Sequence, residues 1–140
     1  MTENKLLDPC LKVLRAEMPQ KAMELRLPGP VILKHADGMT SGSPDVSVDF
    51  RKLTSWWEFK HGPKIKWAHG LQQLTCQRLA RASTCHVVLY EEKEIDERIK
   101  KRTVILTPDE VEVEAVDGFN HRFILDYIWR THATSRTLTT

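Results

Sequence analysis

The sequence, 140 residues long, predicts an α/β fold. Three observations predict it. Apolar and polar residues alternate with a period of two in residues 45–50 and 55–60, as they do in half-buried strands. Apolar residues recur at helical spacing before these segments and again in residues 67–83. A short apolar run follows at residues 86–90, so helices and strands alternate along the chain.

The first element is predicted to be a helix that ends near Glu17. Its start has two alternatives. The apolar helical pattern opens at Glu3, whereas Pro9, which fits poorly inside a helix, favours a start near Asp8 as the N-cap. A short strand is predicted next, at residues 31–34.

The two alternating segments are predicted to form one hairpin. Asp45 shares a face with Ser47, and Glu58 shares a face with Lys60 and Trp56. Because opposed residues of an antiparallel pair lie on the same face, a suitable register joins Asp45 to Glu58 and Lys60. The expected register sets Lys60 opposite Asp45 and Glu58 beside Ser47, with residues 51–54 as a four-residue loop.

The second half of the chain continues with a helix at residues 67–83 and a strand at 86–90. Residues 91–102 are expected to form a connector or an exposed helix, because acids and bases alternate there without an apolar face. The last two strands and the final amphipathic helix are predicted at residues 103–106, 111–116 and 119–130. Residues 1–130 are expected to form a single domain, and residues 131–140 a frayed tail.

Asp45, Glu58 and Lys60 are residue types that suit metal-dependent phosphodiester cleavage. Mg²⁺ takes oxygen ligands and is usually held by one or two carboxylates together with substrate phosphate. Asp45 and Glu58 supply two carboxylates, and the backbone carbonyl of Phe59 could add a third oxygen. Lys60 could orient or deprotonate the attacking water and offset charge on the phosphate. Each short motif alone is also common at protein surfaces without any catalytic role. Their joint occurrence at hairpin spacing is what favours a nuclease site.

Together these segments resemble the PD-(D/E)XK nucleases, and more narrowly the small VRR-NUC (virus-type replication-repair nuclease) members of phages and bacteria. The resemblance covers approximately residues 2–92 and rests on Ser41-Gly42-Ser43-Pro44-Asp45, Trp57-Glu58-Phe59-Lys60-His61 and Gly70-Leu71-Gln72-Gln73-Leu74-Thr75. It implies a restriction-endonuclease-like core: a mixed central sheet flanked by helices in the order α-β-β-β-α-β, followed by two further strands and a C-terminal helix. It also implies that Asp45 and Glu58 bind the metal, Lys60 is catalytic and a helix glutamine completes the site.

Gln72 is the glutamine expected in the site. It borders an apolar stripe of the helix, made of Leu71, Thr75, Leu79 and Ala82. Gln73 and Gln77 lie on the far side and are expected to face solvent or DNA. The alternative is that all three glutamines are ordinary helix formers.

The family often adds a metal-binding acid from the first helix, and Glu3 is the best match by motif position. Asp8 and Glu17 are the other candidates. The alternative for Glu3 is an acid favoured near a helix N-terminus by the helix dipole.

Net charge is only +2, so affinity for DNA has to come from a local patch. The residues expected to contact nucleic acid are His61, Lys64, Lys66, His69, Gln73 and Arg78, and the alternative is an ordinary solvated face. Trp56 and Trp67 either stack on unpaired bases or pack inside, whereas Trp57 and Trp129 are expected in the core. Residues 34–37 either line the cleft or hold His35 in a structural role.

The three cysteines show no closely paired spacing, and the chain has no signal peptide or long apolar run. An intracellular, reduced protein without a membrane partner is therefore expected, and the resemblance implies the cytoplasm of a bacterial or phage-infected host. A zinc site can be drawn, but its spacings match no standard pattern; it would use Cys76, Cys85, His69 and His86.

The function expected from these features is a Mg²⁺- or Mn²⁺-dependent DNA endonuclease that uses metal-activated water. Structure-selective cutting at junctions, flaps or nicks is expected, because no separate base-reading element is evident. An exonuclease is one alternative, and a noncatalytic nucleic-acid-binding or assembly module on a nuclease fold is another. Branched DNA and a second copy of the chain are the expected partners; Leu125, Ile128 and Trp129 serve either a dimer contact or the core.

Overall fold

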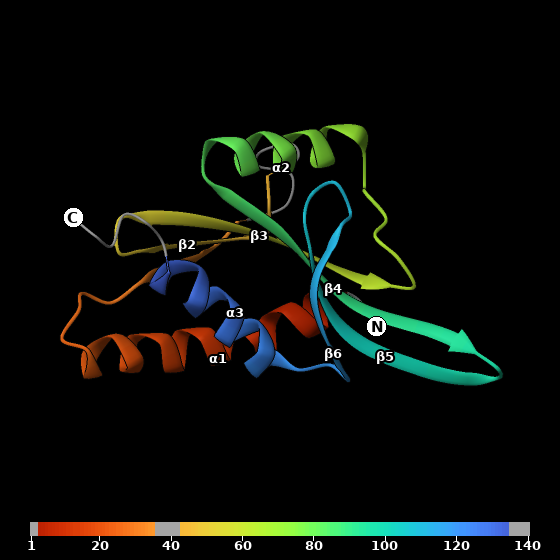
Figure 1. The fold of residues 1–140 in the computed structure, drawn as a ribbon, viewed down its shortest axis with the longest axis horizontal. Helices are drawn as coiled ribbons and strands as arrows, with labels where there is room; N and C mark the ends of the chain where they lie inside the picture. Colours follow the sequence, from red (N-terminus) through yellow and green to blue (C-terminus); the bar gives the residue numbers. More distant parts are fainter. Residues whose placement is uncertain (1–2, 36–42, 135–140) are drawn as a thin grey trace.

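The computed structural model describes residues 3–35 and 43–134. Within these ranges six strands form one mixed sheet in the order β1-β2-β3-β4-β5-β6. Helices α1 and α3 cover one face of the sheet, and α2 lies across the other (Figure 1). The element order confirms the predicted α/β fold class. The bounds are α1 Glu3–Glu24, β1 Val31–Lys34, β2 Val46–Phe50, β3 Leu53–Gly62, α2 Gly70–Ala82, β4 Thr84–Ile95, β5 Arg98–Leu106, β6 Glu112–Asp117 and α3 His121–Ala133.

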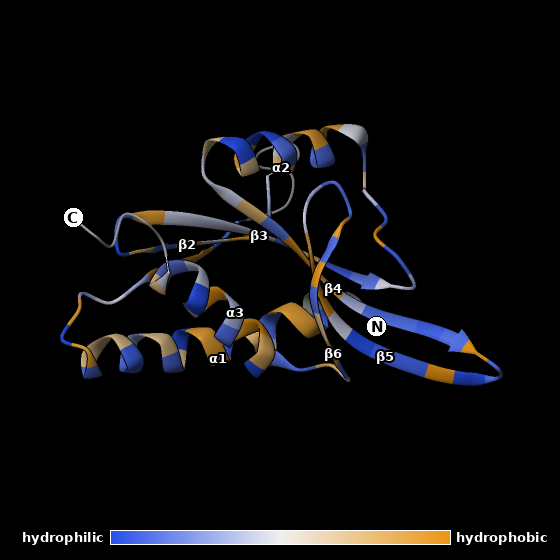
Figure 2. Ribbon diagram, in the orientation of Figure 1, coloured by the Kyte–Doolittle hydropathy of each residue, from blue (hydrophilic) through white to orange (hydrophobic). Residues whose placement is uncertain are grey.

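The main core lies between the sheet and the helices α1 and α3, whose inner sides are hydrophobic (Figure 2). Trp57 is fully buried there, which confirms its predicted place. Leu125 and Ile128 are buried in the same core, so they are not available for a dimer contact. Trp129 is partly buried and packs on Phe50, with ring centres 5.2 Å apart.

Helix α1 runs seven residues further than the predicted end near Glu17 and contains two prolines, Pro9 and Pro19. Of the two alternatives for the helix start, the one at Asp8 is wrong, because α1 begins at Glu3. A proline inside a helix costs about 3 kcal/mol or more. That cost is offset because the apolar stripe continues at helical spacing through both prolines and is buried against the sheet; its members are Leu7, Leu11, Leu14, Met18 and Ala22.

The β2–β3 hairpin has a different register from the predicted one. Val46 lies opposite Trp57 and Phe50 opposite Leu53, so the loop is the two-residue turn Arg51-Lys52 instead of residues 51–54. Both turn residues have positive φ, 57° and 65°. That conformation gives a tight turn whose twist matches the flanking strands. Since the register moved by two residues, every side chain stays on its expected face.

Residues 91–102 form neither a connector nor a helix. They extend β4 and β5 as an antiparallel ribbon, paired as far as Ile95 and Arg98. The turn residues Asp96 and Glu97 have positive φ, 52° and 64°, and close the ribbon tightly. Alternating charge without an apolar face predicts a connector or an exposed helix, but a two-stranded ribbon places alternate residues on opposite faces and accommodates the same pattern.

The C-terminal helix ends at Ala133, past the predicted boundary at residue 130. His132 is fully buried, so residues 131–133 belong to the folded domain. Residues 135–140, which make up the rest of the expected tail, lie outside the described residues. None of the described helices is long and apolar enough to cross a membrane.

Candidate active site

Asp45, Glu58 and Lys60 come together at the centre of the sheet. Glu58 and Lys60 lie in β3, which pairs with β2 on one side and with β4 on the other. Trp57 and Phe59 point into the core under α1 and α3, so Glu58 and Lys60 point to the face beneath α2. Asp45 directly precedes β2, and its Oδ2 accepts a hydrogen bond of 2.8 Å from the backbone N–H of Phe59. The carboxylate of Asp45 is thereby fixed beside the middle of β3.

Gln72 of α2 connects the two charged residues of β3. Lys60 Nζ donates to Gln72 Oε1 at 2.7 Å, and Gln72 Nε2 donates to Glu58 Oε2 at 3.0 Å. The backbone N–H of Ala68 donates to the same Oε1 at 3.0 Å, which fixes the orientation of the amide. The structure therefore places Gln72 where the sequence expected the site glutamine.

The predicted apolar stripe of this helix, which Gln72 borders, is wrong. Leu71 is 56% exposed, and the buried residue of α2 is Cys76, one turn after Gln72. The side of α2 that faces the sheet lies over Glu58 and Lys60 of β3, so it carries the Gln72 amide and the Cys76 thiol instead of leucines. Gln73 and Gln77, expected to face solvent or DNA, are half-buried, and their amides donate to Pro108 O and Asp109 Oδ1 in the turn after β5.

Burial and charge set the protonation of Glu58. The residue is 2% exposed, and burial together with the nearby Asp45 carboxylate raises the Glu58 pKa to about 8. Lys60 opposes this shift, since its Nζ lies 3.3 Å from Glu58 Oε2. The Lys60 ammonium also lies 5.6 Å from the ring centre of Trp67, within the range of a cation–π interaction. A glutamate that is hard to ionise thus adjoins a buried lysine.

The oxygen atoms at this point fit a hard divalent cation. Glu58 Oε1 is buried and has no hydrogen-bond partner among the described residues, which is costly for a carboxylate oxygen. The N–H and C=O of a strand residue point to the same side, so the carbonyl of Phe59 faces the same side as Asp45. No group of three or more histidine, cysteine or acidic side chains that could hold a metal ion occurs within the described ranges. Two carboxylates and a carbonyl are nevertheless a sufficient protein contribution for Mg²⁺, which keeps several waters.

Acids of the first helix do not add to this set in the part of the chain that the structure describes. Asp8 pairs with Lys34 of β1 at 2.9 Å, and Glu17 pairs with Arg122 of α3. The backbone of Glu3 begins α1, but its side chain lies outside the described residues.

His35 and Trp56 form a wall beside Asp45. The His35 N–H donates to Asp45 O at 2.7 Å, and its Nε2 lies 2.8 Å from Ser47 Oγ. The ring stacks on Trp56 with centres 5.2 Å apart. Trp56 shares its strand face with Glu58, as strand alternation predicts from the sequence. Ala36, Asp37, Ser41 and Gly42 lie outside the described residues.

The expected nucleic-acid contacts divide into two groups. Lys64, Lys66, His69 and Arg78 are exposed in the segment that leads into α2 or on that helix. His61 is not part of this patch, because alternation along β3 turns it to the face opposite Lys60. Its Nε2 lies 3.0 Å from Glu92 Oε1, and its ring contacts Phe119 edge-on.

The zinc alternative is not formed in the described part of the chain. Cys10, Cys76 and Cys85 are all buried free thiols, and no metal-binding group of three includes them. His86 instead stacks on Trp57, with ring centres 5.3 Å apart.

No family model matches the sequence, and no curated protein is similar enough to match. Among solved structures, the chain is similar to Hjc, a Holliday junction resolvase from the archaeal hyperthermophile Archaeoglobus fulgidus. The two are 14% identical with a TM-score of 0.38, over 77% of this chain and 93% of that chain. At this identity and TM-score, the function has to be argued from the side chains of the site.

Proposed function

We propose that the protein is a Mg²⁺- or Mn²⁺-dependent DNA endonuclease of the PD-(D/E)XK type. The observation that carries the proposal is the meeting of Asp45, Glu58 and Lys60 on one face of β3, with one Glu58 oxygen buried and unbonded. A fold that needed these groups only for packing would gain by satisfying or replacing them. A site that binds a cation and a phosphate explains why these side chains are not fully paired within the protein.

Each residue has a separate task. Asp45, Glu58 and the Phe59 carbonyl hold the cation through oxygen atoms. When bound there, a divalent cation supplies Lewis-acid polarisation of the phosphate and a more acidic water.

Lys60 offers its ammonium to the charge that develops on the phosphate. Gln72 keeps that ammonium in place through a 2.7 Å hydrogen bond, so little reorganisation is needed during the reaction.

Branched DNA is the proposed substrate class. The described elements all belong to the sheet or to the helices that cover it, and none stands apart as a helix for reading bases in the major groove. Junction, flap or nick structure is then the feature left to recognise. The motif resemblance to VRR-NUC proteins of phages and bacteria supports this choice, and action as a homodimer would suit two symmetric cuts.

The test is cleavage of end-labelled duplex, single-stranded, flap and four-way-junction DNA with Mg²⁺, Mn²⁺ or chelator. We expect metal-dependent cleavage that falls at least about 100-fold in Asp45→Asn and Lys60→Ala, the loss typical of removing one transition-state contact. Asp49→Asn is the matched control, because Asp49 is exposed on the same strand face and bonds only to Thr54 among described side chains. Its cleavage should equal that of the wild type.

A covalently closed circle separates the remaining alternatives. Nicking of the circle establishes an endonuclease, whereas cleavage of linear DNA alone indicates an exonuclease. Tight, salt-dependent binding without any cleavage would contradict the proposal and favour the noncatalytic module.

A further inference from the structure

The ends of β4 and β5 project from the body of the protein as a ribbon of residues 91–102. Residues 93–101 are all exposed, and strand pairing continues to Ile95 and Arg98. Figure 1 shows this ribbon extending past the helices on both faces of the sheet, and Figure 2 shows that it is mostly hydrophilic. Two strands without a core beneath them are only marginally stable in water. Packing inside the protein therefore does not explain the length of these strands.

The strand register sorts the charges of the ribbon by face. Its twelve residues carry five acidic and five basic side chains, so the ribbon is neutral overall. Opposed residues share a face, and the pairs 91–102, 93–100 and 95–98 define one face. That face, called the basic face below, carries four basic residues and one acid: Lys93, Arg98, Lys100, Arg102 and Glu91. The opposite face carries Glu92 and Glu94 with a single base, Lys101.

The basic face lies on the same side of the sheet as the candidate active site. Leu89 and Val104 belong to the core cluster on the α2 side of the sheet. Because residues two apart in a strand share a face, Glu91 and Lys93 lie on the same side as Leu89. On the other side, the Lys101 ammonium lies 5.2 Å from the ring centre of Phe119. Leu89 is opposite Lys60 in the register. A rise of ~3.3 Å per residue puts Lys93 about 13 Å and Ile95 about 20 Å beyond that point.

Among the described residues, the positive charges on the outer part of the basic face form no ion pair of their own. Arg102, near the base of the ribbon, pairs with Glu91 at 2.8 Å and with Glu112 at 3.1 Å. Lys93 shares Glu91 at 3.6 Å. Arg98 and Lys100 form no ion pair with any residue that the structure describes. The exposed Lys64 and Lys66 follow β3, whose last residue Gly62 pairs with Glu91, so they add charge near the base of the ribbon.

We propose that the basic face binds the phosphate backbone of a DNA duplex that extends from the cleavage site. This inference rests on the proposed function. Charge complementarity selects the partner, because basic side chains repeat at every second residue along β5, about 6.6 Å apart, with Lys93 of β4 opposite Lys100, and a duplex presents a regular row of phosphates. A two-stranded ribbon is also narrow enough to follow a DNA groove. The ribbon then acts as an arm that holds the substrate about 13–20 Å from the reacting phosphate.

The test measures DNA binding in the Asp45→Asn protein, which binds without cutting. Fluorescence anisotropy with a labelled duplex is followed over a salt series for the ribbon variant Lys93→Gln/Arg98→Gln/Lys100→Gln. We expect Kd to rise at least about tenfold near physiological salt, and the slope of log K against log salt to fall by about 2–3, close to one unit for each lost phosphate contact. A single strand of the same length should be affected less.

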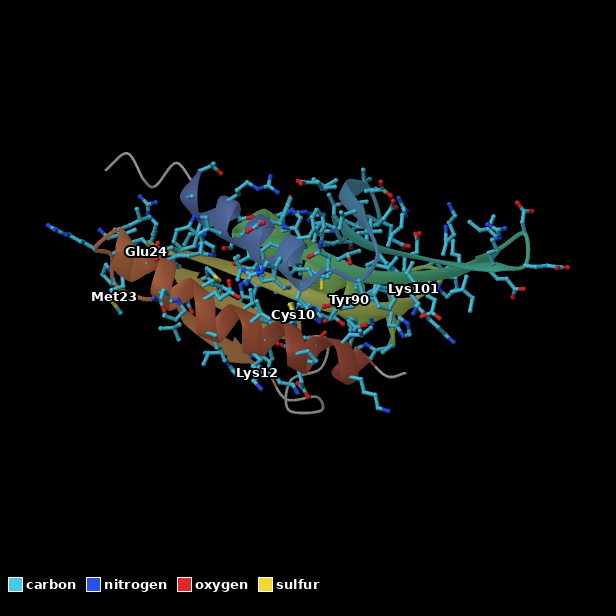
Figure 3. The ribbon with its side chains drawn as sticks, turned by 90° about the horizontal axis from the view of Figure 1, so that it is seen from below. Cys10, Lys12, Met23, Glu24, Tyr90 and Lys101 are labelled. Atoms are coloured by element: carbon cyan, nitrogen blue, oxygen red, sulfur yellow. The ribbon has the colours of Figure 1, made fainter. Side chains whose placement is uncertain are left out.

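Two controls separate the arm from a general effect of charge. Lys5→Gln/Lys12→Gln/Arg26→Gln removes the same charge from α1 and the turn after it; Figure 3 shows Lys12 on α1, under the opposite face of the sheet. Lys100→Gln and Lys101→Gln compare neighbours of equal charge on opposite faces of the ribbon. We expect Lys100→Gln to weaken binding about three- to tenfold, as loss of one phosphate contact does. Lys101→Gln and the α1 triple variant should change Kd less than twofold.

Equal losses of DNA affinity in the ribbon and α1 triple variants, or no loss of affinity in the ribbon variant, would overturn the proposal that the ribbon binds DNA. A change of oligomeric state in the ribbon variant, seen by light scattering without a change in DNA affinity, would also overturn it and assign the ribbon to a second copy of the chain. The outcomes for arm and nuclease are separable. If the wild type cleaves DNA and the ribbon variant binds DNA normally, only the proposal about the ribbon is contradicted. If binding depends on the ribbon but the wild type does not cleave, only the proposed nuclease activity is contradicted.

Discussion

Gln72 holds both charged groups of β3 at once, because its amide accepts from Lys60 and donates to Glu58. A residue of this kind acts by positioning. Without the amide, Lys60 loses its hydrogen-bond acceptor on α2 but keeps its ion pair with Glu58 at 3.3 Å and its contact with the Trp67 ring, and Glu58 loses its hydrogen bond from α2.

We expect Gln72→Ala to lower single-turnover cleavage about 10- to 100-fold, the usual range for loss of a group that orients metal ligands. Gln72→Glu should not restore activity, since it replaces the amide donor to Glu58 with a carboxylate. Gln77→Ala is the control, because Gln77 lies on the same helix and bonds to Asp109. Loss of activity to the same extent in Gln77→Ala would show that α2 as a whole, and not the Gln72 amide, is responsible.

Glu58 connects metal binding to pH. Burial and Asp45 raise its pKa to about 8, so at pH 7 the carboxyl is mostly protonated, whereas a metal ligand has to be ionised. Binding of Mg²⁺ or Mn²⁺ should therefore release a large part of one proton at pH 7, and affinity should increase with pH until about pH 8.

Calorimetric titration of the metal in buffers of different ionisation enthalpy measures this proton. Because Asp45 is one cause of the raised pKa, Asp45→Asn should leave Glu58 easier to ionise while removing a ligand. Metal binding by the wild type that is independent of the buffer and of pH between 6 and 8 would contradict the role of Glu58 as a ligand.

The site residues of β3 could be predicted from the sequence because strand parity survives an error in register. The hairpin is shifted by two residues from the expected pairing, yet Asp45, Glu58 and Lys60 keep a common face. The partners of Gln72 could not be predicted in the same way. One of them is the backbone N–H of Ala68, which carries no side-chain signal.

At the level of elements, the turn Arg51-Lys52 holds two residues in a backbone conformation that is unfavourable for their residue types. Both residues are left-handed, with φ of 57° and 65°, a conformation that costs an ordinary residue roughly 1 kcal/mol. We expect Arg51→Asn/Lys52→Gly to raise the free energy of unfolding by about 1 kcal/mol in urea titrations, because Asn-Gly is the preferred pair in such turns.

The control for the turn is Arg51→Ala/Lys52→Ala. It removes the same two charges and leaves side chains at positive φ, so it should give no gain in stability. Equal stabilisation by both variants would assign the effect to charge and not to the backbone.

The ribbon of residues 91–102 shows why local patterns did not predict every element. Its alternating charges have no apolar side in any conformation, so hydrophobic periodicity gives no preference for strand or helix. The strands are specified instead by pairing between β4 and β5, which begins in the core at Val87 and Leu106 and continues outward. In α1, by contrast, the apolar stripe decided the outcome despite two prolines.

At the level of the whole molecule, the two faces of the sheet carry different kinds of side chain. The face under α1 and α3 is apolar and contains the main core. The face under α2 carries Glu58, Lys60 and a smaller apolar cluster, and it continues outward into the basic face of the ribbon. Sequence alternation predicted that two such faces exist. Which helix covers which face depends on the crossover from β3 to β4, and that is a property of the complete fold.

His132 ties the C-terminal helix to the β2–β3 hairpin and makes stability depend on pH. Its Nδ1 lies 2.8 Å from Phe50 O and its Nε2 2.8 Å from Ser55 Oγ, which also accepts from Trp57 Nε1. Burial lowers the pKa of His132 below its usual value of 6.5. Its contribution to stability is therefore complete above pH 6.5 and is lost as the pH falls through the lower pKa of the folded state.

We expect the free energy of unfolding of the wild type, measured in urea between pH 7.5 and 5, to fall more steeply than that of His132→Gln. The difference should approach ~1.4 kcal/mol per pH unit, which corresponds to one proton taken up on unfolding. Burial also lowers the pKa of His86 and His121, whereas the raised pKa of Glu58 acts in the opposite sense. These contributions are common to both proteins and cancel in the comparison. Parallel curves would mean that His132 is not the proton acceptor that couples α3 to the hairpin.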